Sequence, residues 1–346
     1  MRSRLLVVVA FLAMAAVPAY LAWTTGFLPG PQQASADSTG PATTSSAAVA
    51  PLAWPQEPLG LAAGDTRIYW EQRARSADAA GIWYHDVPSG DTGRLLGRDA
   101  AGKSGGFPAA GGHLLAWESW AGRRGDGVAG IQAFNLEIGH RWRLTEAGRA
   151  ARVVGDAVFW VDPDGAGRGK DVIRGVNALT DEEYTLETGG RVRSFAAWGP
   201  WAVWISGGGS IGEVWAGSFR SATRYRLAAR GTAVAMDRDR VLWAASAGRH
   251  SSTIVSWNRR SSRSRVLCRL RGAASSLAMS RHTAVWVVDR KATGPQVWAY
   301  DFEIGKATPV SEAGGRQVSP VIVAGSVYWA DDRSGRWELY SHSLGH

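Results

Sequence analysis

Val241-Leu242-Trp243 is a short apolar segment that ends in tryptophan, and six similar segments recur on both sides of it. The full set of tryptophans lies at successive intervals of 47, 43, 44, 39, 43 and 43 residues, and comprises Trp70, Trp117, Trp160, Trp204, Trp243, Trp286 and Trp329. An interval of this length holds four short strands and their turns, which make up one blade of a β-propeller. We therefore predict an all-β, seven-bladed β-propeller; six or eight blades fit the spacing less well. The tryptophans are expected to be core residues between adjacent blades.

Two further positions follow the same period. Gly or Asp precedes several of the tryptophan segments, as in Gly155-Asp156, and predicts a hairpin turn. A second strand begins about a dozen residues after the tryptophan and ends in Asn or Asp, as at Asn135 and Asp301. Such side chains bond the backbone of the next turn. A third strand follows. The apolar segment ahead of the next turn, such as Phe195-Ala196-Ala197, is predicted as the fourth strand of the repeat.

The last repeat is incomplete, because the chain ends four residues after His342 and leaves no room for an outer strand. An apolar segment, Ala50-Pro51-Leu52-Ala53-Trp54, stands alone ahead of the first repeat. A ring leaves sheet edges unpaired unless its two ends are joined. We therefore predict that residues 50–346 form the propeller and that residues 50–56 supply the outer strand of the last blade.

The N-terminal segment has the features of an export signal. Arg2 and Arg4 precede an apolar run that extends to Trp23, and no charged residue follows Arg4 until Asp37. A positive start and an apolar stretch of near-membrane length predict an apolar helix over residues 1–28, either a signal peptide or a membrane anchor. Residues 29–49 are rich in Pro, Ser, Thr, Ala and Gly, which predicts a flexible, disordered linker. The propeller is accordingly expected outside the cytoplasmic membrane, anchored or secreted.

Charge and cysteine content narrow the partner classes. The formal net charge is +9, and it is +8 from residue 50 onward because only Arg2, Arg4 and Asp37 precede that point. An excess of positive charge favours an anionic partner, although an arginine-rich solvated surface is the alternative. The single cysteine, Cys268, excludes an intrachain disulfide, and the seven histidines form no cluster with the spacing of metal ligands. We expect no metal, cofactor or nucleic acid, and a monomer.

The stretch Trp329-Ala330-Asp331-Asp332-Arg333-Ser334-Gly335-Arg336-Trp337-Glu338-Leu339-Tyr340 resembles the TolB-like, WD40-like repeats of exported bacterial β-propellers. It has the apolar strand, the Asp-Arg-Ser-Gly turn and the strand ending in an aromatic residue, and the resemblance covers residues 57–346. It implies a propeller that serves as a binding scaffold. The α/β domain that precedes the propeller in TolB itself is not visible in this sequence.

Three segments match motifs of catalytic or metal sites only in part. Residues 97–104 match the phosphate-loop pattern, but Gly105-Gly106-Phe107-Pro108 cannot begin the helix that such a loop needs. Residues 208–212 match the nucleophile-elbow pattern, but a strand-like segment follows them. Residues 162–171 alternate acidic residues with glycines, yet they lack the twelfth-position Glu of a calcium loop. We predict a loop or a turn at each of these segments.

The connections after the tryptophan strands are the longest and most charged in the repeats, and they gather on one face of a propeller. Loops on a rigid scaffold are the usual place for recognition. We therefore predict a partner-binding face that contains Arg73, Arg75, Arg123, Arg124, Arg168, Lys170, Arg249, Arg290, Lys291, Arg333 and Arg336. The alternative is a ring of solvated loops without a partner.

Three functions remain open at this point, and the third is a sensor domain without a signalling partner in the same chain. The first is an extracytoplasmic scaffold, tethered to the membrane through its N-terminal segment, that binds a protein or an anionic envelope polymer. The second is an enzyme of the lyase, lactonase or glycosidase type that acts at the central channel. The predicted innermost segments, such as Phe195-Ala196-Ala197 and Leu277-Ala278-Met279, are apolar or small and favour the scaffold. No catalytic residue is predicted.

Overall fold

The computed structural model describes residues 47–54, 58–72, 80–97, 105–119, 130–163, 169–221, 223–248 and 250–345. The predicted signal peptide or anchor and nearly all of the predicted linker lie outside these residues. Within the described part of the chain, every regular element is a β-strand. No helix among these residues has the length and apolar character needed to cross a membrane.

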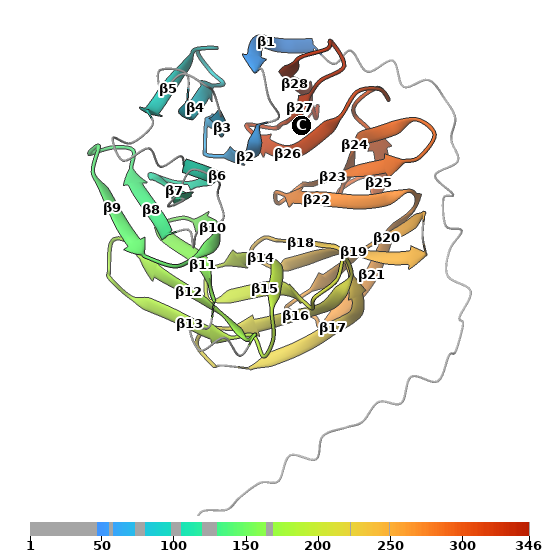
Figure 1. Ribbon diagram of the computed structural model, residues 1–346. Helices are drawn as coiled ribbons and strands as arrows, with labels where there is room; N and C mark the ends of the chain where they lie inside the picture. Colours follow the sequence, from blue (N-terminus) through green and yellow to red (C-terminus); the bar gives the residue numbers. More distant parts are fainter. Residues whose placement is uncertain are drawn as a thin grey trace, which may run out of the picture. The chain divides into compact units, whose positions relative to one another are not determined.

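The strands form seven antiparallel sheets of four strands each. The innermost strand of each sheet contacts the innermost strand of the next, and the innermost strands of the first and last sheets also touch. The sheets therefore close into a ring of seven blades around a central axis (Figure 1). This arrangement confirms the predicted all-β, seven-bladed β-propeller.

We number the blades 1 to 7 along the chain and give their strands from innermost to outermost. Blade 1 contains β2 (Leu59–Ala63), β3 (Arg67–Gln72), β4 (Gly81–Asp86) and β5 (Thr92–Gly97). Blade 2 contains β6 (Gly105–Gly111), β7 (Leu114–Ser119), β8 (Gly130–Asn135) and β9 (Arg141–Thr145). Blade 3 contains β10 (Arg149–Val154), β11 (Ala157–Pro163), β12 (Asp171–Asn177) and β13 (Glu183–Glu187). Blades 4 and 5 contain β14 (Val192–Trp198), β15 (Trp201–Ser206), β16 (Gly212–Ser218) and β17 (Arg224–Gly231); and β18 (Ala233–Met236), β19 (Arg240–Gly248), β20 (Ser251–Asn258) and β21 (Arg263–Arg271). Blades 6 and 7 contain β22 (Ala273–Met279), β23 (Thr283–Arg290), β24 (Gly294–Asp301) and β25 (Lys306–Pro309); and β26 (Gln317–Val323), β27 (Ser326–Asp331), β28 (Trp337–Ser343) and β1 (Ala47–Trp54).

The boundaries of the blades differ from those of the sequence repeat. The segment Phe195-Ala196-Ala197, predicted as the fourth strand of its repeat, belongs to β14, the innermost strand of blade 4. The tryptophan strand is therefore the second strand of its sheet. The reason is that the hairpin before each tryptophan joins it to the preceding apolar segment, so these two strands pair.

Blade 7 is completed by a strand from the other end of the chain. β1 pairs antiparallel with β28, with Ala47 opposite Ser341 and Trp54 opposite Trp337. The sequence placed this strand at residues 50–56, whereas it begins three residues earlier, at Ala47, and residues 55–57 lie outside the described residues. The pairing covers the edge of β28 that would otherwise stay unpaired.

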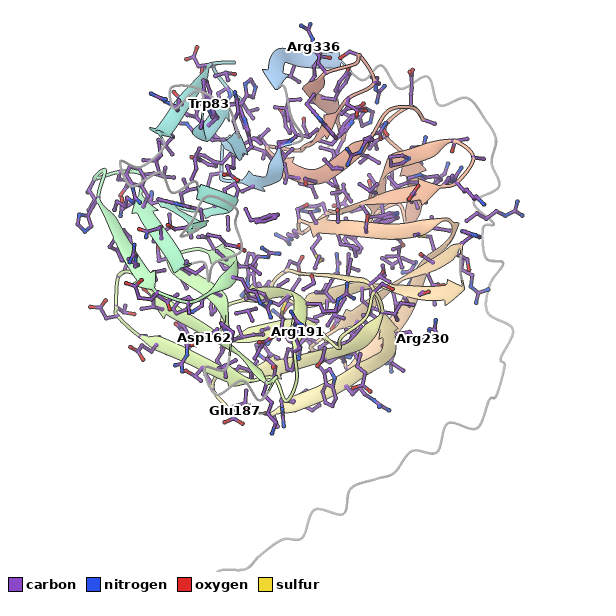
Figure 2. All side chains as sticks on the ribbon, viewed as in Figure 1. Trp83, Asp162, Glu187, Arg191, Arg230 and Arg336 are labelled. Carbon is purple, nitrogen blue, oxygen red and sulfur yellow. The ribbon has the colours of Figure 1, made fainter. Side chains whose placement is uncertain are left out.

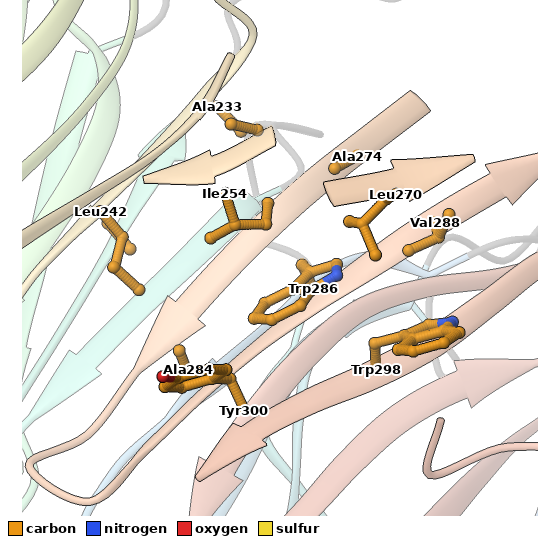
Figure 3. Close-up of a cluster of buried hydrophobic side chains, with 12 residues drawn as sticks. Ala233, Leu242, Ile254, Leu270, Ala274, Ala284, Trp286, Val288, Trp298 and Tyr300 are labelled. Atoms are coloured by element: carbon orange, nitrogen blue, oxygen red, sulfur yellow. The ribbon is translucent and has the colours of Figure 1, made fainter. Parts of the chain in front are cut away.

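All seven tryptophans of the repeat are buried, which confirms that they are core residues. Trp204 on β15 packs against Phe159 and Ile173 of blade 3, whereas its neighbours Val203 and Ile205 pack towards blade 5. Alternate side chains of a strand point to opposite faces of the sheet, so one strand serves both interfaces. Every repeat tryptophan packs in this way against the preceding blade. Figure 3 shows the core that contains Trp286.

The ring has two faces that carry different connections. Consecutive strands of a blade are antiparallel, so their connections alternate between the two edges. We call one edge the loop face. It carries the connections from the second to the third strand of a blade, such as residues 207–211, and the connections from one blade to the next, such as residues 188–191. We call the turn face the edge with the two hairpins of each blade, such as residues 199–200 and 259–262.

The predicted Asn and Asp column organises the turn face. Asn135 accepts hydrogen bonds at its Oδ1 from the backbone N–H groups of Glu137 and Ile138, at 2.9 and 3.1 Å. Equivalent bonds to the backbone of the following turn are accepted by Asp86, Asn177, Asn258 and Asp301. The prediction that these side chains bond the next turn is confirmed.

Candidate functional site

Five of the eleven cations predicted to form a binding face are described. They are Lys170, Arg290, Lys291, Arg333 and Arg336, and all five lie on or next to the loop face. The other six lie outside the described residues: Arg73, Arg75, Arg123, Arg124, Arg168 and Arg249. The described members come from blades 3, 6 and 7.

Three of these five cations are held by other side chains of the propeller. Arg333 donates hydrogen bonds from Nε and Nη2 to the buried carboxylate of Asp331. Arg336 donates from Nε to Glu338 at 3.1 Å and projects from the edge of blade 7 (Figure 2). Arg290 lies over the ring of Trp298 at 5.1 Å. Lys170 and Lys291 are exposed.

Buried carboxylates near the loop face connect neighbouring blades. Glu118 of β7 accepts a hydrogen bond from the backbone N–H of Ala150 on β10, and burial raises the pKa of Glu118. Asp171 of β12 accepts one from the N–H of Val192 on β14 at 2.6 Å and also pairs with Arg149. These acids complete the hydrogen bonding of the next innermost strand, which is a structural role.

The innermost strands carry one buried cation at the interface of blades 3 and 4. Arg152 on β10 donates from Nε to the carbonyl oxygen of Phe195 on β14 at 3.2 Å, and its guanidinium faces the Phe195 ring. Burial lowers the pKa of Arg152. Its contacts join two blades, and no group of three metal-binding side chains occurs among the described residues.

Of the three motif-like segments, only residues 208–211 are described as a predicted loop over most of their length. The described ends of the other two belong to strands, with Gly97 in β5, Asp162 and Pro163 in β11 and Asp171 in β12. Gly105, directly after the phosphate-loop pattern, begins strand β6 instead of a helix. Residues 207–211 form a bend between two strands, so Ser210 lies in a hairpin loop and not in a nucleophile elbow. In the acidic segment, Asp162 pairs with Arg174 at 2.6 Å. Residues 98–104 and 164–168 lie outside the described residues.

Acidic and basic side chains predominate on different parts of the turn face, although the exposed Glu303 lies on blade 6 and the exposed Arg141 on blade 2. Exposed carboxylates gather on blades 1 to 3; we call them the acidic sector, which comprises Asp65, Asp91, Glu137, Asp181, Glu182 and Glu183. Exposed guanidinium groups gather on blades 4 to 6; we call them the basic sector, which comprises Arg220, Arg224, Arg238, Arg260, Arg263 and Arg281. Grouped like charges create a local potential that attracts partners of opposite sign.

A pocket of about 400 Å³ opens on the turn face within the basic sector. It lies between blades 4 and 5 and is lined by Trp201, Tyr225, Leu227, Trp257, Arg259, Arg260 and Ser262. The rings of Trp201 and Tyr225 are inclined by only 18° with their centroids 6.3 Å apart, and Tyr225 is 47% exposed. The volume falls within the range of small-ligand sites.

One repeat position explains why the pocket opens at this interface. In every blade, a residue just after the third strand donates its backbone N–H to a carbonyl oxygen of the hairpin that joins the first two strands. We call this the plug position, and it is occupied by Val87, Leu136, Ala178, Phe219, Arg259, Phe302 and Leu344. The six apolar members pack into the interface with the preceding blade. Arg259 is the charged member, and there the turn-face end of the interface stays open.

The two arginines of the pocket differ in their contacts. The Arg259 guanidinium lies 4.9 Å from the centroid of the Trp201 ring, and its buried Nε has no hydrogen-bond partner among the described residues. Arg260 donates from Nε to Asp239 at 2.8 Å, which lowers the pKa of Asp239 and raises the pKa of Arg260. The Nη2 of Arg259 lies 3.8 Å from the same Asp239 carboxylate, so two guanidinium groups share one carboxylate and the pocket carries a net positive charge.

A third aromatic residue, which does not line the pocket, lies opposite Trp201 on the neighbouring strand. Trp198 is 42% exposed and pairs with Trp201 across the hairpin of blade 4, so both side chains project from the same face of the sheet. Trp198, Trp201 and Tyr225 stand on the first, second and fourth strands of the blade. Neighbouring strands are about 4.8 Å apart, so this aromatic strip extends about 14 Å across the blade.

The pocket residues do not stand out in the sequence by charge, because the longest and most charged connections between strands lie on the loop face. A signal was nevertheless present. The residue after the Asn or Asp of each third strand is apolar in Val87, Leu136, Ala178 and Phe302, but it is Arg259 in the fifth repeat. A charged residue in an apolar repeat column indicates an interface that is not filled.

Comparisons with known proteins give the fold and no family. No protein-family model matches the sequence, and no curated protein matches it. The propeller domain of the Trilobed protease from Pyrococcus furiosus, described as having an open velcro topology, is similar with a TM-score of 0.63 and 11% identity over 85% of this chain and 96% of that chain. The resemblance to TolB-like repeats therefore stays a resemblance.

Other similar structures contain the propeller within an enzyme. A prolyl endopeptidase gives a TM-score of 0.63 at 13% identity over 83% of this chain and 47% of that chain, so this chain spans about half of its length. An oligogalacturonate lyase in complex with manganese gives 0.57 at 10% identity over 82% of this chain and 87% of that chain. Identities this low establish a shared fold only.

Proposed function

We propose that this chain is an exported β-propeller that serves as a binding scaffold and captures an anionic partner in the pocket between blades 4 and 5. The observation that carries the proposal is Arg259 at the plug position. An apolar residue there would fill the interface, as it does in the other six blades, and would contribute hydrophobic stabilisation. The chain instead holds a cation beside aromatic rings, which is the composition of a binding site.

The basic sector supports an anionic partner. Arg238, Arg263 and Arg281 are exposed, and none of them has a carboxylate within ion-pair distance among the described residues. The buried acids near the loop face, by contrast, are occupied in joining blades. Binding is therefore better supported than catalysis.

The test compares binding of poly-L-glutamate and polygalacturonate to the purified chain at low and at physiological ionic strength. We expect binding that weakens with salt and that is lost in Arg260→Glu/Arg263→Glu. The matched control is Lys170→Glu/Lys291→Glu, which makes the same charge change on the loop face. Loss of binding in the control alone would overturn the proposal and favour the loop face. No binding of either polymer would overturn it altogether.

A lyase or peptidase activity is the second candidate, because propellers of both classes of enzyme are among the similar structures. Incubation with oligogalacturonate and Mn²⁺, followed by absorbance of unsaturated products, tests the first activity. Release of a chromophore from peptide substrates tests the second. Turnover by the purified chain would replace the scaffold with an enzyme.

A further inference from the structure

We propose that the pocket between blades 4 and 5 recognises an acidic carbohydrate, whose sugar rings lie on the aromatic strip and whose carboxylate binds Arg259 and Arg260. The inference rests on the proposed function and adds the chemical class of the ligand. Three features of the pocket carry it: a flat aromatic wall, guanidinium groups at one side of that wall, and hydroxyl groups on the rim.

The aromatic wall suits the apolar face of a sugar ring. The C–H groups on that face carry partial positive charge and pack against the electron-rich face of an aromatic ring. Trp201 and Tyr225 present nearly parallel rings, and Trp198 continues the strip towards the axis. A strip of about 14 Å is longer than one sugar ring, so it accommodates a short oligosaccharide better than a single sugar.

The guanidinium groups supply the charge selectivity. The Nε of Arg259 is buried at the pocket without a partner among the described residues, although its Nη2 donates to the carbonyl oxygen of Arg238 at 2.8 Å. A carboxylate in the pocket would pair with the guanidinium groups that line it. Arg–carboxylate pairs are geometrically specific and strong. A neutral sugar would form no such pair.

Hydroxyl groups complete the lining. The phenol of Tyr225 and the side chain of Ser262 border the pocket, and each hydroxyl donates one hydrogen bond and accepts two. Ser262 adopts a left-handed conformation with φ of 54°, where blades 1, 2 and 6 have Gly90, Gly139 and Gly305 at the same place in the turn. Polar lining of this kind matches a ligand that is rich in hydroxyl groups.

The test measures calorimetric binding of short galacturonic acid oligomers to the full chain. Three other probes are compared with them. Methyl esters of the same oligomers keep the sugar rings and lose the charge, and poly-L-glutamate keeps the charge and lacks the rings. Oligo-dT offers phosphates and bases. We expect the acid oligomers to bind at least tenfold more tightly than each of the other three probes. Equal binding of poly-L-glutamate would overturn the carbohydrate assignment and leave the scaffold proposal intact. Preference for oligo-dT would assign the pocket to nucleic acid instead.

Two variants separate recognition from folding. Tyr225→Ala removes an exposed ring and should weaken binding of the acid oligomers about tenfold, the equivalent of one stacking contact. Arg259→Phe restores an apolar plug, and it should abolish binding while the thermal midpoint stays equal or rises. The control on the same face is Ile304→Ala, which lies outside both the pocket and the basic sector and should leave affinity within twofold. Full binding by Arg259→Phe with an intact midpoint would overturn the inference.

Discussion

Glu118 of blade 2 and Ala150 of blade 3 are joined by a hydrogen bond of 2.6 Å from the Ala150 backbone N–H to the Glu118 carboxylate. The carboxylate is buried, and burial raises its pKa above the ordinary value of a Glu. One side chain therefore satisfies a backbone donor and at the same time carries a desolvated charge. These two effects on stability have opposite signs, and two substitutions separate them.

Glu118→Ala leaves the Ala150 donor without its partner and should lower the free energy of unfolding by about 1–3 kcal/mol at pH 7. Glu118→Gln keeps an acceptor and removes the charge, so its stability at pH 7 should equal or exceed that of the parent. Urea denaturation measures both values. A Gln variant as unstable as the Ala variant would contradict the hydrogen-bond role.

The raised pKa of Glu118 also gives a pH dependence with a definite sign. The folded chain binds the Glu118 proton more tightly than the unfolded chain, so this group's contribution to stability falls as pH rises from the ordinary pKa of a Glu through the folded value. The free energy of unfolding of Glu118→Gln should therefore rise relative to the parent between pH 4.5 and pH 7. A constant difference over that range would contradict the shift.

Trp286 should be among the residues whose truncation costs most. It is fully buried between blades 5 and 6, and Trp286→Ala leaves a cavity that should lower the free energy of unfolding by about 3–5 kcal/mol. Trp198→Ala is the matched control, because that ring is 42% exposed and its loss should change stability by only about 0.5 kcal/mol. Equal losses in chemical denaturation would contradict the packing described.

The Cys268 thiol should be unreactive in the folded chain. Burial raises the pKa of Cys268 to about 12, so almost no thiolate exists at pH 8. Ellman's reagent should therefore react slowly with the folded chain and at full speed in guanidinium chloride. Rapid labelling in native buffer would contradict the burial. Cys268→Ser provides the blank.

Removal of β1 should open the ring. Deletion of residues 1–54 exposes the edge of β28, so the chain should melt at a lower temperature and associate through that edge. Deletion of residues 1–46 leaves β1 intact and serves as the control. Thermal denaturation and light scattering read both effects, and identical behaviour of the two deletions would show that the β1–β28 pairing does not stabilise the fold.

The number of blades was predictable because the fold repeats a local pattern. Trp70 and its six counterparts each mark the second strand of a blade. Asn135 and its counterparts mark the hairpin that follows the third strand. The start of β1 at Ala47 was less predictable, because pairing with Ser341 and not local sequence decides where that strand begins. The assignment of Phe195 to the next sheet likewise depends on pairing.

The candidate site was not predictable by counting charges. Arg333 and Arg336 look available in the sequence, yet Asp331 and Glu338, two residues away from them, hold them in the folded chain. A pocket depends on which side chain fills the contact with a neighbouring blade, and only the alignment of repeats brings Arg259 to attention.

The pairing of β1 with β28 also has a consequence for the kinetics of folding. Strands within one blade are close in sequence, so each blade can assemble as its own segment becomes available. Ala47 and Ser341, by contrast, come from nearly opposite ends of the chain, and bringing them together is the longest-range event in the fold. The earliest strand must therefore wait for the latest one, so we expect closure of the ring to be a late and slow step of folding.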